Sequence, residues 1–439
     1  MMRAQSILMA TPAFEDCTER RAEQTVAMRQ GGPAVAIFVE PLLAPNMTFI
    51  RAQASALRAF DPFYVSPQRC SPSLELPAGR SAVICENPQA PRSWNLLKQV
   101  PLKLFGYAPL FFRRVQEYRP ALVHAHFGVT ALTALPLARW LHLPMIVTFH
   151  GYDATVTDSF LKTSHYRARR YLKERKSLQR EAAQFVAVSE FIRRQMLLQG
   201  FPEDKVLVHY IGVDTDFFRS VGEQRREPIV LFVASLTEKK ACAHLVRAMG
   251  EVQRVVPDVE LVVIGDGPLR KNLEQLAASG LRKYRFLGIQ PPEVVRDWMN
   301  RATVFCVPSM RAPSGDGEGF GMVFAEAQAM GLPVASYASG GVPEAVDHGE
   351  TGLLAAEGDW EGLAGNIVTL LQNKNLWQQM NAAGPRRIRK AFDLKKQTNK
   401  LEDIYRRVLS EAELKLPAGR VLAQKLTRRN INENRGSAE

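Results

Sequence analysis

Short, uninterrupted runs of apolar residues, rich in valine and isoleucine, alternate along most of this chain with longer segments of helical periodicity. Runs of about four to eight apolar residues bounded by Gly, Pro or polar turns are typical of strands buried on both faces, as in parallel sheets. The helical segments between them, such as residues 243–255 and 268–278, supply the crossover connections. The expected strands are residues 34–39, 81–85, 121–126, 145–149, 185–188 and 206–210, then 229–234, 261–264, 284–287, 303–307 and 334–336.

The polar segment at residues 219–227 (RSVGEQRRE) separates the two series of strands and is the expected linker. We therefore expect two doubly wound α/β domains of similar size, residues 33–218 and 228–393, with a cleft between them. In such sheets, ligands bind beyond the carboxyl ends of the strands. Residues 1–32 have no hydrophobic period and are expected to form a poorly ordered extension. A helix at residues 394–414 and a basic tail at 415–439 are expected to follow the second domain.

Composition narrows the class of protein. The 439 residues carry 57 Lys and Arg against 44 Asp and Glu, a net charge of +13, and 46% are hydrophobic, as in an ordinary globular protein. A run of about 18 apolar residues is missing, which argues against a polytopic membrane protein. The apolar piece at residues 6–10 is too short for a signal peptide, and the five scattered cysteines indicate reduced thiols. We expect a cytoplasmic protein whose charge suits nucleic acid, an anionic membrane or a phosphate-bearing substrate.

The most informative stretch is residues 308–331, PSMRAPSGDGEGFGMVFAEAQAMG. A strand is expected to end at Val307, a glycine-rich loop follows, and a helix should begin near Gly321. Glycines let the backbone approach a ligand closely, and a helix N-terminus offers unpaired N–H groups to an anion. Glu318 lies in the loop and Glu326 in the helix. From these residues alone, two interpretations stay open: a functional, ligand-binding role, and a solvent-exposed glutamate near a helix N-terminus, where the helix dipole favours it.

Glu318 and Glu326, with seven residues between them and an EGFG opening, match the paired-glutamate motif of the family-4 retaining glycosyltransferases. Further motifs agree with this family in order and spacing. They are HAHFG at 124–128, TFHGYD at 148–153, VSEFIRRQM at 188–196, IGVDTDFF at 211–218, LTEKKA at 236–241, IGDGP at 264–268 and SGGVPE at 339–344. The chain thus resembles this family over residues 33–410. Within the family it is most similar to the branch that assembles lipid-linked exopolysaccharide or lipopolysaccharide repeats.

The resemblance implies the GT-B fold, in which two Rossmann-like domains face each other across a cleft. The acceptor would bind the first domain and a nucleotide-sugar donor the second. Glu326 would bind the ribose hydroxyls of the donor, and Glu318, as a catalytic residue, would contact hydroxyls of the transferred sugar. A carboxylate suits both roles because it accepts two charge-assisted hydrogen bonds from neighbouring hydroxyls. The other donor contacts implied at this loop are Gly319, Phe320, Gly321, Met322 and Val323.

Lys240 matches the lysine with which the family neutralises the departing diphosphate, so the resemblance implies that it binds the donor and assists catalysis. The family usually has an arginine five residues earlier, where this chain has Ser235, and a glycine where this chain has Ala241. The second positive contact to the diphosphate is therefore open, with Arg270 and Arg311 as candidates.

On the first domain, the resemblance implies a catalytic His150, with Asp153 orienting its ring or binding the acceptor. Thr48, in the PNMTFI segment at residues 45–50, is expected to face the acceptor. His124 and His126 end the preceding expected strand, and we interpret them as structural and rim residues. No metal ion or other cofactor is expected, since no carboxylate or histidine cluster has convincing ligand spacing.

Two basic segments of the first domain bear on the acceptor. Residues 97–114 mix aromatic and leucine side chains with lysines and arginines, as in a helix at a membrane interface or a segment packed in a core. Residues 165–176 form a second basic cluster, for which a solvated helix face is the alternative. With a lipid-linked acceptor, these segments would hold the protein peripherally on the inner face of an anionic plasma membrane. The cations concerned are Lys98, Lys103, Arg113 and Arg114, with Arg167 to Lys176.

Three functions compete at this stage. The first is a metal-independent retaining hexosyltransferase that uses a nucleotide-sugar and a lipid-linked or saccharide acceptor. The second is a nucleotide-sugar 2-epimerase, which shares the two-domain fold. The third, a nucleic-acid-binding protein, rests on net charge alone because no recognised binding motif is present. The sequence leaves the donor nucleotide, the sugar, the acceptor, the linkage and the oligomeric state open.

Overall fold

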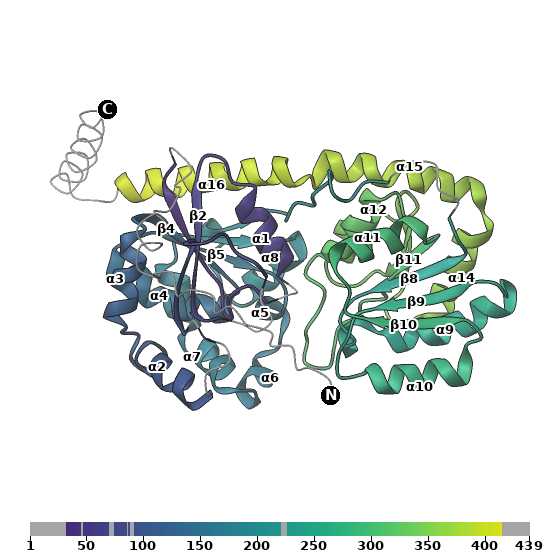
Figure 1. Cartoon of the computed structure of the whole chain (residues 1–439), viewed down its shortest axis with the longest axis horizontal. Helices are drawn as coiled ribbons and strands as arrows, with labels where there is room; N and C mark the ends of the chain where they lie inside the picture. Colours follow the sequence, from purple (N-terminus) through teal and green to yellow (C-terminus); the bar gives the residue numbers. More distant parts are fainter. Residues whose placement is uncertain are drawn as a thin grey trace, which may run out of the picture.

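The computed structural model describes residues 32–44, 47–69, 74–85, 87, 92–220 and 226–414. Residues 1–31 of the expected extension, residues 221–225 of the expected linker and the basic tail lie outside the described residues. The described chain forms two α/β domains side by side, with two consecutive helices at the end of the described chain running along one edge of both (Figure 1).

The first domain is built on a seven-stranded parallel sheet in the order β3-β2-β1-β4-β5-β6-β7. Its strands are β1 Ala34–Phe38, β2 Asp61–Gln68, β3 Ser81–Cys85, β4 Pro120–His126, β5 Met145–Phe149, β6 Gln184–Ala187 and β7 Val206–Val208. Its helices are α1 Thr48–Ser55, α2 Arg92–Phe105, α3 Pro109–Glu117, α4 Gly128–Leu141, α5 Tyr152–Thr155, α6 Asp158–Thr163, α7 Tyr166–Glu181 and α8 Glu190–Leu198. The strand order reverses direction at β1 and β4, which places ligand-binding loops at that switch point.

The second domain repeats the plan with a six-stranded parallel sheet in the order β10-β9-β8-β11-β12-β13. Its strands are β8 Ile229–Val233, β9 Glu260–Ile264, β10 Tyr284–Gly288, β11 Val304–Cys306, β12 Val334–Tyr337 and β13 Gly352–Ala355. Its helices are α9 Cys242–Val255, α10 Arg270–Gly280, α11 Pro292–Arg301, α12 Met322–Ala329, α13 Val342–Ala345, α14 Trp360–Gln372 and α15 Lys374–Ala391. Two doubly wound domains are thus confirmed.

Two strands escaped the sequence analysis. The sequence of β2 is DPFYVSPQ. Its two prolines indicate a turn rather than a strand, because proline has no N–H to donate to a sheet ladder. β13 reads GLLA, a four-residue segment too short to form a recognisable apolar run. Both lie outside the central strands, β13 at the edge of its sheet and β2 next to the edge strand β3.

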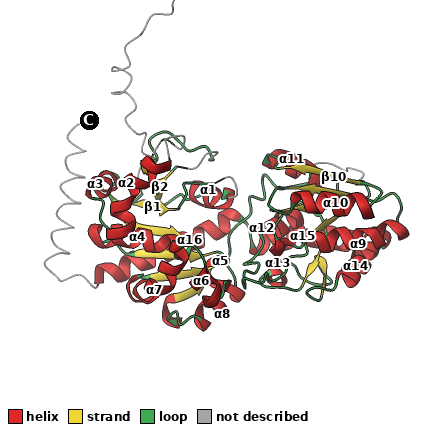
Figure 2. Cartoon of the chain, turned by 90° about the horizontal axis from the view of Figure 1, so that it is seen from below, coloured by secondary structure: helices red, strands yellow, loops and turns green. Residues whose placement is uncertain are grey.

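The last described helix, α16 (Leu394–Leu414), packs against the first domain although it follows the second in sequence. Figures 1 and 2 show α15 beside the second domain and α16 beside the first. The buried Tyr405 ring contacts Phe60 edge-on, and its hydroxyl lies 2.6 Å from His124 Nδ1 of β4. Glu402 accepts the backbone N–H groups of Arg58 and Ala59 at 2.6 and 2.7 Å. The helix therefore completes the core on one face of the first sheet.

We expect Tyr405→Ala to lower the free energy of unfolding by about 3–5 kcal/mol, the usual cost of truncating a fully buried aromatic side chain. The urea midpoint of unfolding measures this change. Arg406→Ala, a truncation of the exposed neighbouring side chain, is the matched control and should change stability by about 0.5 kcal/mol or less. Equal midpoints for the two variants would contradict the structural role assigned to α16.

Candidate functional site

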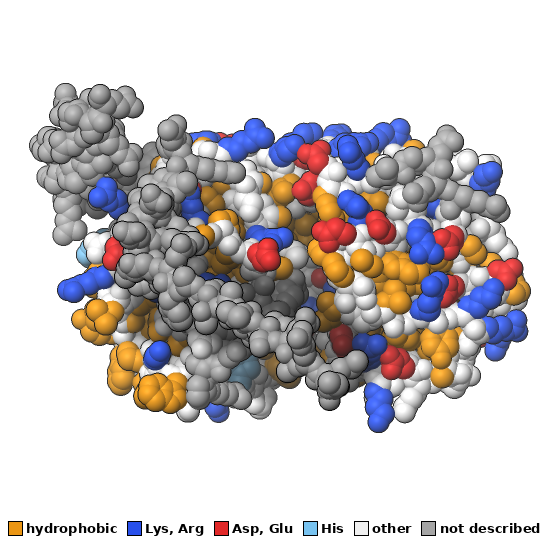
Figure 3. All heavy atoms as spheres, viewed as in Figure 1, with side chains coloured by type: hydrophobic (Ala, Val, Ile, Leu, Met, Phe, Trp, Pro, Cys, Tyr) orange, Lys and Arg blue, Asp and Glu red, His pale blue; other side chains and the backbone are white. Residues whose placement is uncertain are grey.

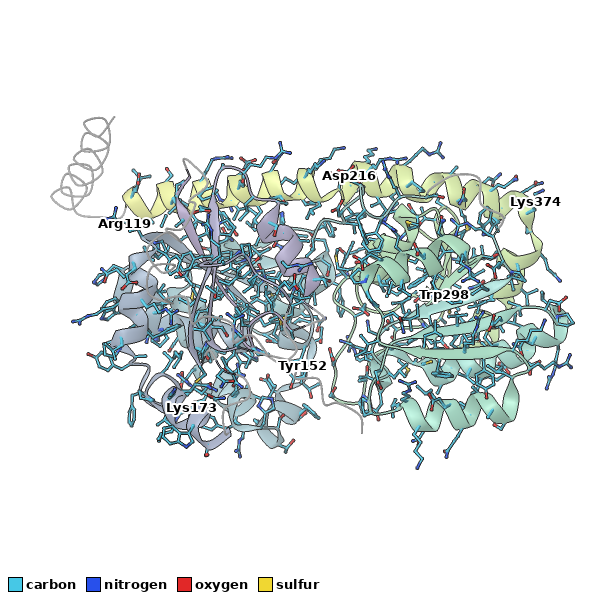
Figure 4. All side chains as sticks on the ribbon, in the orientation of Figure 1. Arg119, Tyr152, Lys173, Asp216, Trp298 and Lys374 are labelled. Atoms are coloured by element: carbon cyan, nitrogen blue, oxygen red, sulfur yellow. The ribbon has the colours of Figure 1, made fainter. Side chains whose placement is uncertain are left out.

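The two domains meet where the glycine-rich loop after β11 lies against the segment that follows β5. A Cβ atom at Gly319 would lie 1.9 Å from the carbonyl oxygen of His150, so only glycine fits there. The Ser189 hydroxyl donates to the Gly319 carbonyl at 2.6 Å, and the Gly317 N–H donates to Thr155 Oγ1 at 3.1 Å. Figure 4 marks Tyr152, the first residue of α5, on the side of the first domain that faces the second. The carboxyl ends of both sheets therefore border one site.

Glu318 is the most tightly held carboxylate of this loop. It is 8% exposed, and its Oε2 accepts hydrogen bonds from Lys240 Nζ and, at 3.0 Å, from Ser309 Oγ. Burial raises the pKa of Glu318, but the charges of Lys240 and Lys239 and these two hydrogen bonds outweigh it and lower the pKa to about 2. The structure thus brings together Glu318 and Lys240, which are far apart in sequence, as a charged pair.

A second ion pair lies beside the first and was missed by the sequence analysis. Lys239 Nζ is 3.0 Å from Asp316 Oδ2, and Thr155 Oγ1 of the first domain lies 3.4 Å from Asp316 Oδ1. The consecutive lysines and the acidic residue two positions before Glu318 were the available signal. Two lysine side chains from the short 3-10 helix Glu238–Lys240 therefore reach the glycine-rich loop.

The residues that depart from the family pattern lie next to these lysines. Ser235 is exposed just beyond the end of β8. Ala241 has a φ of +43°, a left-handed conformation that glycine adopts without strain. Of the two arginines considered, Arg270 is already paired with Glu274 at 2.8 Å and Asp266 at 3.3 Å. Lys239 is paired as well, but its partner lies in the glycine-rich loop, whereas the partners of Arg270 lie after β9 and on α10, so Lys239 is the better placed second cation.

Glu326, on α12, is in a different state from Glu318. The residue is half-buried, and its carboxyl group has no hydrogen bond or ion pair to any residue in the described part of the chain. Burial raises its pKa to about 7. The N–H groups of Phe320, Gly321, Met322 and Val323, at the start of the same helix, likewise donate to no described backbone oxygen. A half-buried carboxyl group and free helix-terminal N–H groups suit a ligand with both hydroxyl and phosphate groups.

His150 lies at the carboxyl end of β5, enclosed by aromatic rings. Its ring centroid is 5.1 Å from that of Phe49 and 4.6 Å from that of Phe127. Its Nε2 is 3.0 Å from His126 Nδ1, whereas its Nδ1 is buried without a partner among the described residues. Burial, reinforced by His124, lowers the pKa of His150 to about 3. The prediction that His126 is a rim residue is wrong: it is 2% exposed and contacts His150 directly.

Asp153 does not orient the ring of His150. Its Oδ2 accepts the N–H of Gly128 at 2.8 Å, and its Oδ1 accepts those of His150 and Gly151 at 3.2 and 3.1 Å. Burial raises its pKa to about 6, against the opposing effect of these bonds. The carboxylate is thus committed to backbone groups, with Asp153 4% exposed, so the expectation that it orients the ring is wrong, whereas its role in binding the acceptor stays a prediction. Thr48 is the first residue of α1, beside Phe49, and its acceptor role stays a prediction.

Glu344, in the SGGVPE motif, joins the two domains. Its carboxylate accepts the N–H groups of Glu190 and Phe191 at the start of α8, both at 2.7 Å, and the Tyr210 hydroxyl at 3.0 Å. A carboxylate is favourable at a helix N-terminus because of the helix dipole. The motif was recognised in the sequence, but this contact between domains was not anticipated.

Among the described residues, no group of three or more His, Cys, Asp or Glu side chains is placed to hold a metal ion. No described helix is both long and apolar enough to span a membrane.

Two family models match this chain. Residues 213–387 match the model for glycosyl transferases group 1, and residues 48–217 match the model for glycosyltransferase family 4. The amylovoran biosynthesis glycosyltransferase AmsK of Erwinia amylovora is 29% identical over 57% of this chain and 61% of its own length. The colanic acid biosynthesis glycosyltransferase WcaL of Salmonella typhimurium, a putative assignment in its name, is 29% identical over 56% and 60%.

A GDP-mannose-dependent alpha-(1-6)-phosphatidylinositol monomannoside mannosyltransferase of Mycolicibacterium smegmatis is 32% identical over 59% of this chain and 69% of its own length. The chain therefore spans about three fifths of the length of AmsK and WcaL, and more than two thirds of the mannosyltransferase.

Solved structures agree on the fold. Anabaena Alr3699/HepE, crystallised with UDP and glucose, has a TM-score of 0.68 at 17% identity over 85% of this chain and 99% of its own. Sucrose-phosphate synthase from Thermosynechococcus elongatus has a TM-score of 0.66 at 20% identity over 86% of this chain and 100% of its own. The GT-B arrangement of two Rossmann-like domains is thereby confirmed.

The raised pKa of Glu326 predicts a pH-dependent stability. Between about pH 4.5 and 7 the folded protein keeps a proton that the unfolded chain has released, so this group lowers the free energy of unfolding as pH rises through that window. Glu326→Gln should therefore stabilise the protein by up to about 3 kcal/mol at pH 8 and by little at pH 4. Urea unfolding at the two pH values measures the difference, with Glu361→Gln, an exposed glutamate of α14, as the control. A gain from Glu326→Gln that is the same at both pH values would contradict the burial of this carboxyl group.

Proposed function

Because this chain belongs to the group 1 glycosyl transferases, we propose that it transfers a hexose from a nucleotide-sugar to a lipid-linked acceptor, with retention of anomeric configuration. The pathway we propose is exopolysaccharide or lipopolysaccharide assembly, in line with the printed names of AmsK and WcaL. The observation that carries the proposal is the contrast at the glycine-rich loop. Glu318 is charged and paired with Lys240, whereas Glu326 is half-buried and has no described partner. The 2-epimerase alternative gains no support from these relatives.

In this proposal the donor binds along the start of α12. The ribose hydroxyls would donate to Glu326, relieving the cost of a buried carboxyl group without a partner. The diphosphate would meet the free N–H groups at the helix start and the ammonium group of Lys240. Lys239, already turned toward the same loop, would supply the second positive charge that the exposed Ser235 cannot. Together these cations would stabilise the departing diphosphate without a metal ion.

The pair formed by Lys240 and Glu318 gives this proposal an order of events. In the structure, Lys240 neutralises Glu318. An arriving diphosphate carries more negative charge than one carboxylate and would draw Lys240 away from Glu318. Glu318, kept ionised by its low pKa, would then accept hydrogen bonds from hydroxyls of the transferred sugar. His150, neutral at ordinary pH, would contact another hydroxyl of the same sugar through its unpartnered Nδ1.

The function is tested by incubating the protein with labelled UDP- and GDP-sugars and a polyprenyl-linked acceptor. We expect label in the lipid fraction, with the anomeric configuration of the donor. Lys240→Gln should lower kcat about 100-fold, as for the loss of one preorganised electrostatic contact. Lys271→Gln, which removes an exposed charge from α10, should not. Acceptor-independent epimerisation of the donor sugar would instead support the epimerase.

The pair of Lys240 and Glu318 also leads to a prediction for nucleotide affinity, which should rise when Glu318 is neutralised. Glu318→Gln should tighten the binding of the free nucleoside diphosphate by roughly tenfold, because Lys240 no longer has a carboxylate partner to leave. It should also lower kcat, since the sugar loses a charged acceptor. Isothermal titration of UDP and GDP measures the affinity. Weaker binding in Glu318→Gln would contradict the exchange of partners.

The membrane part of the proposal rests on a set of exposed apolar side chains on α2, α3 and the turn between them. This α2–α3 apolar surface consists of Trp94, Leu97, Phe105, Tyr107 and Leu110, which are 57–80% exposed. Figure 3 shows hydrophobic side chains gathered at the lower left of the first domain, where α2 and α3 lie in Figure 1. Leu102, Phe111 and Phe112 of the same segment are buried. The two alternatives for residues 97–114 therefore apply to different side chains, and the exposed set supports contact with a membrane interface.

Charge around this surface supports an anionic membrane as the partner. Lys98 and Arg113 are exposed, and neither forms an ion pair with a described residue. Lys103 and Arg167 differ from Lys98 and Arg113 because both form ion pairs with Glu40, at 3.3 and 2.9 Å. On α7, Arg169, Lys173 and Lys176 are likewise exposed without a described ion pair. Figure 4 places Lys173 on the lower side of the first domain, where α2 and α7 lie.

We expect binding to phosphatidylglycerol liposomes that weakens with salt and is poor on neutral liposomes. Phe105→Ser with Leu110→Ser should reduce liposome affinity at least tenfold, because each buried apolar side chain contributes roughly 1.5–3 kcal/mol. Leu198→Ser with Val255→Ser removes two exposed apolar side chains elsewhere and is the matched control. Liposome flotation measures binding. Equal flotation of the two double variants would contradict the α2–α3 apolar surface as the contact.

A further inference from the structure

Three histidines lie together where β4 and β5 end at the cleft. His124 and His126 are two residues apart on β4, and His150 follows β5, which pairs with β4. The His124 and His126 ring centroids are 4.4 Å apart, and those of His126 and His150 are 5.3 Å apart with nearly parallel planes. His124 and His126 are almost fully buried.

The two β4 histidines have different partners. Both ring nitrogens of His124 are engaged, Nδ1 with the Tyr405 hydroxyl at 2.6 Å and Nε2 with Thr148 Oγ1 at 2.7 Å. His126 makes its described hydrogen bond through Nδ1, to His150 Nε2 at 3.0 Å. His124 therefore serves the internal packing of α16 and β5, whereas His126 faces the proposed sugar-binding side chain.

The contact between His126 and His150 determines what His150 offers a ligand. Burial lowers the pKa of both rings, so each is neutral and carries one N–H. If the His150 proton is on Nε2, it is donated to His126 Nδ1, and His150 Nδ1 presents a lone pair. If His126 is the donor, His150 carries its proton on Nδ1 and presents an N–H instead. The direction of the hydrogen bond between the two rings thus decides whether His150 Nδ1 is a hydrogen-bond acceptor or a donor at the cleft.

Burial favours the first arrangement. His150 Nδ1 is one of four described side-chain polar atoms that are buried without a partner, and no ring atom of His126 is among them. Buried N–H groups without an acceptor are rarer than buried acceptors without a donor. A lone pair at His150 Nδ1 is therefore the less costly state, and it is the state that can accept a hydrogen bond from a sugar hydroxyl.

We propose that His126 is a positioning residue, which holds the His150 ring through the bond between Nδ1 and Nε2 so that His150 Nδ1 faces the donor sugar as a hydrogen-bond acceptor. The proposal rests on the proposed function for the identity of the ligand but not for the geometry of the two rings. Phe49 and Phe127 confine the His150 ring by packing. The polar contact described for the His150 ring is the one from its Nε2 to Nδ1 of His126. Packing alone would allow the ring to flip, and the hydrogen bond does not.

The first test needs no activity. Long-range ¹H–¹⁵N spectra of histidine-labelled protein report which nitrogen of His150 is protonated, with His150→Asn identifying its signals. We expect the Nε2–H form in the wild type and in His126→Asn, which retains a polar atom near the position of Nδ1. His126→Phe and His126→Gln should give a mixture of tautomers. An Nδ1–H form in the wild type, or an unchanged tautomer in both of the latter variants, would overturn the proposal.

The second test uses turnover. Relative to the wild type, His126→Phe and His126→Gln should lower kcat at least tenfold with donor KM little changed, because a displaced contact group typically loses about that much or more. His126→Asn should stay within about threefold. His124→Asn is the matched control on the same strand; it should lower the melting temperature without the loss of kcat. Equal kcat losses for His126→Asn and His126→Phe would contradict positioning. If the wild type transfers no sugar at all, the proposed function fails, and the spectra still decide the role of His126.

Discussion

The site depends on a buried ion pair, Glu318 with Lys240. Glu318 is in a loop that reaches toward the other domain, where an unpaired charge would be very costly. Lys240 and Ser309 satisfy it, and this fixes the loop relative to the ends of β8 and β11. Held in this way, the loop brings Gly319 against the carbonyl of His150, where no side chain would fit. This part of the contact between the domains therefore depends on how the carboxylate of Glu318 is neutralised.

The two glutamates of the motif lie on either side of a helix start and differ in pKa. Glu318 precedes Gly321, whose φ of +83° turns the chain into α12, and it is surrounded by lysines. Glu326 lies one to two turns into α12, away from those charges, and burial alone determines its pKa. The pKa of about 2 keeps Glu318 ionised at neutral pH, whereas the pKa of Glu326 is about 7. This difference suits a ligand with a charged part and a hydroxyl-rich part.

Apolar periodicity was enough to predict the two parallel sheets, and the motifs singled out Glu318, Glu326, Lys240 and His150, whose roles stay predictions. What the sequence could not reveal depends on contacts between distant segments. The prolines of β2 concealed a strand whose parallel neighbours supply its hydrogen bonds. Asp153 was expected to orient the His150 ring or bind the acceptor, and the first role is wrong because a free carboxylate and one committed to backbone N–H groups look the same in sequence. The contacts of Glu344 with the first domain and of His126 with His150 after the neighbouring strand depend on the tertiary structure and have no signal in the sequence.

The most direct test is a crystal structure of the protein with a bound nucleoside diphosphate. We predict that the two ribose hydroxyl oxygens lie within about 3 Å of the Glu326 carboxylate, and that Lys240 Nζ has moved from Glu318 to a phosphate oxygen. A nucleotide bound away from α12 would contradict the account. So would a nucleotide in the cleft whose diphosphate leaves the pair of Lys240 and Glu318 intact.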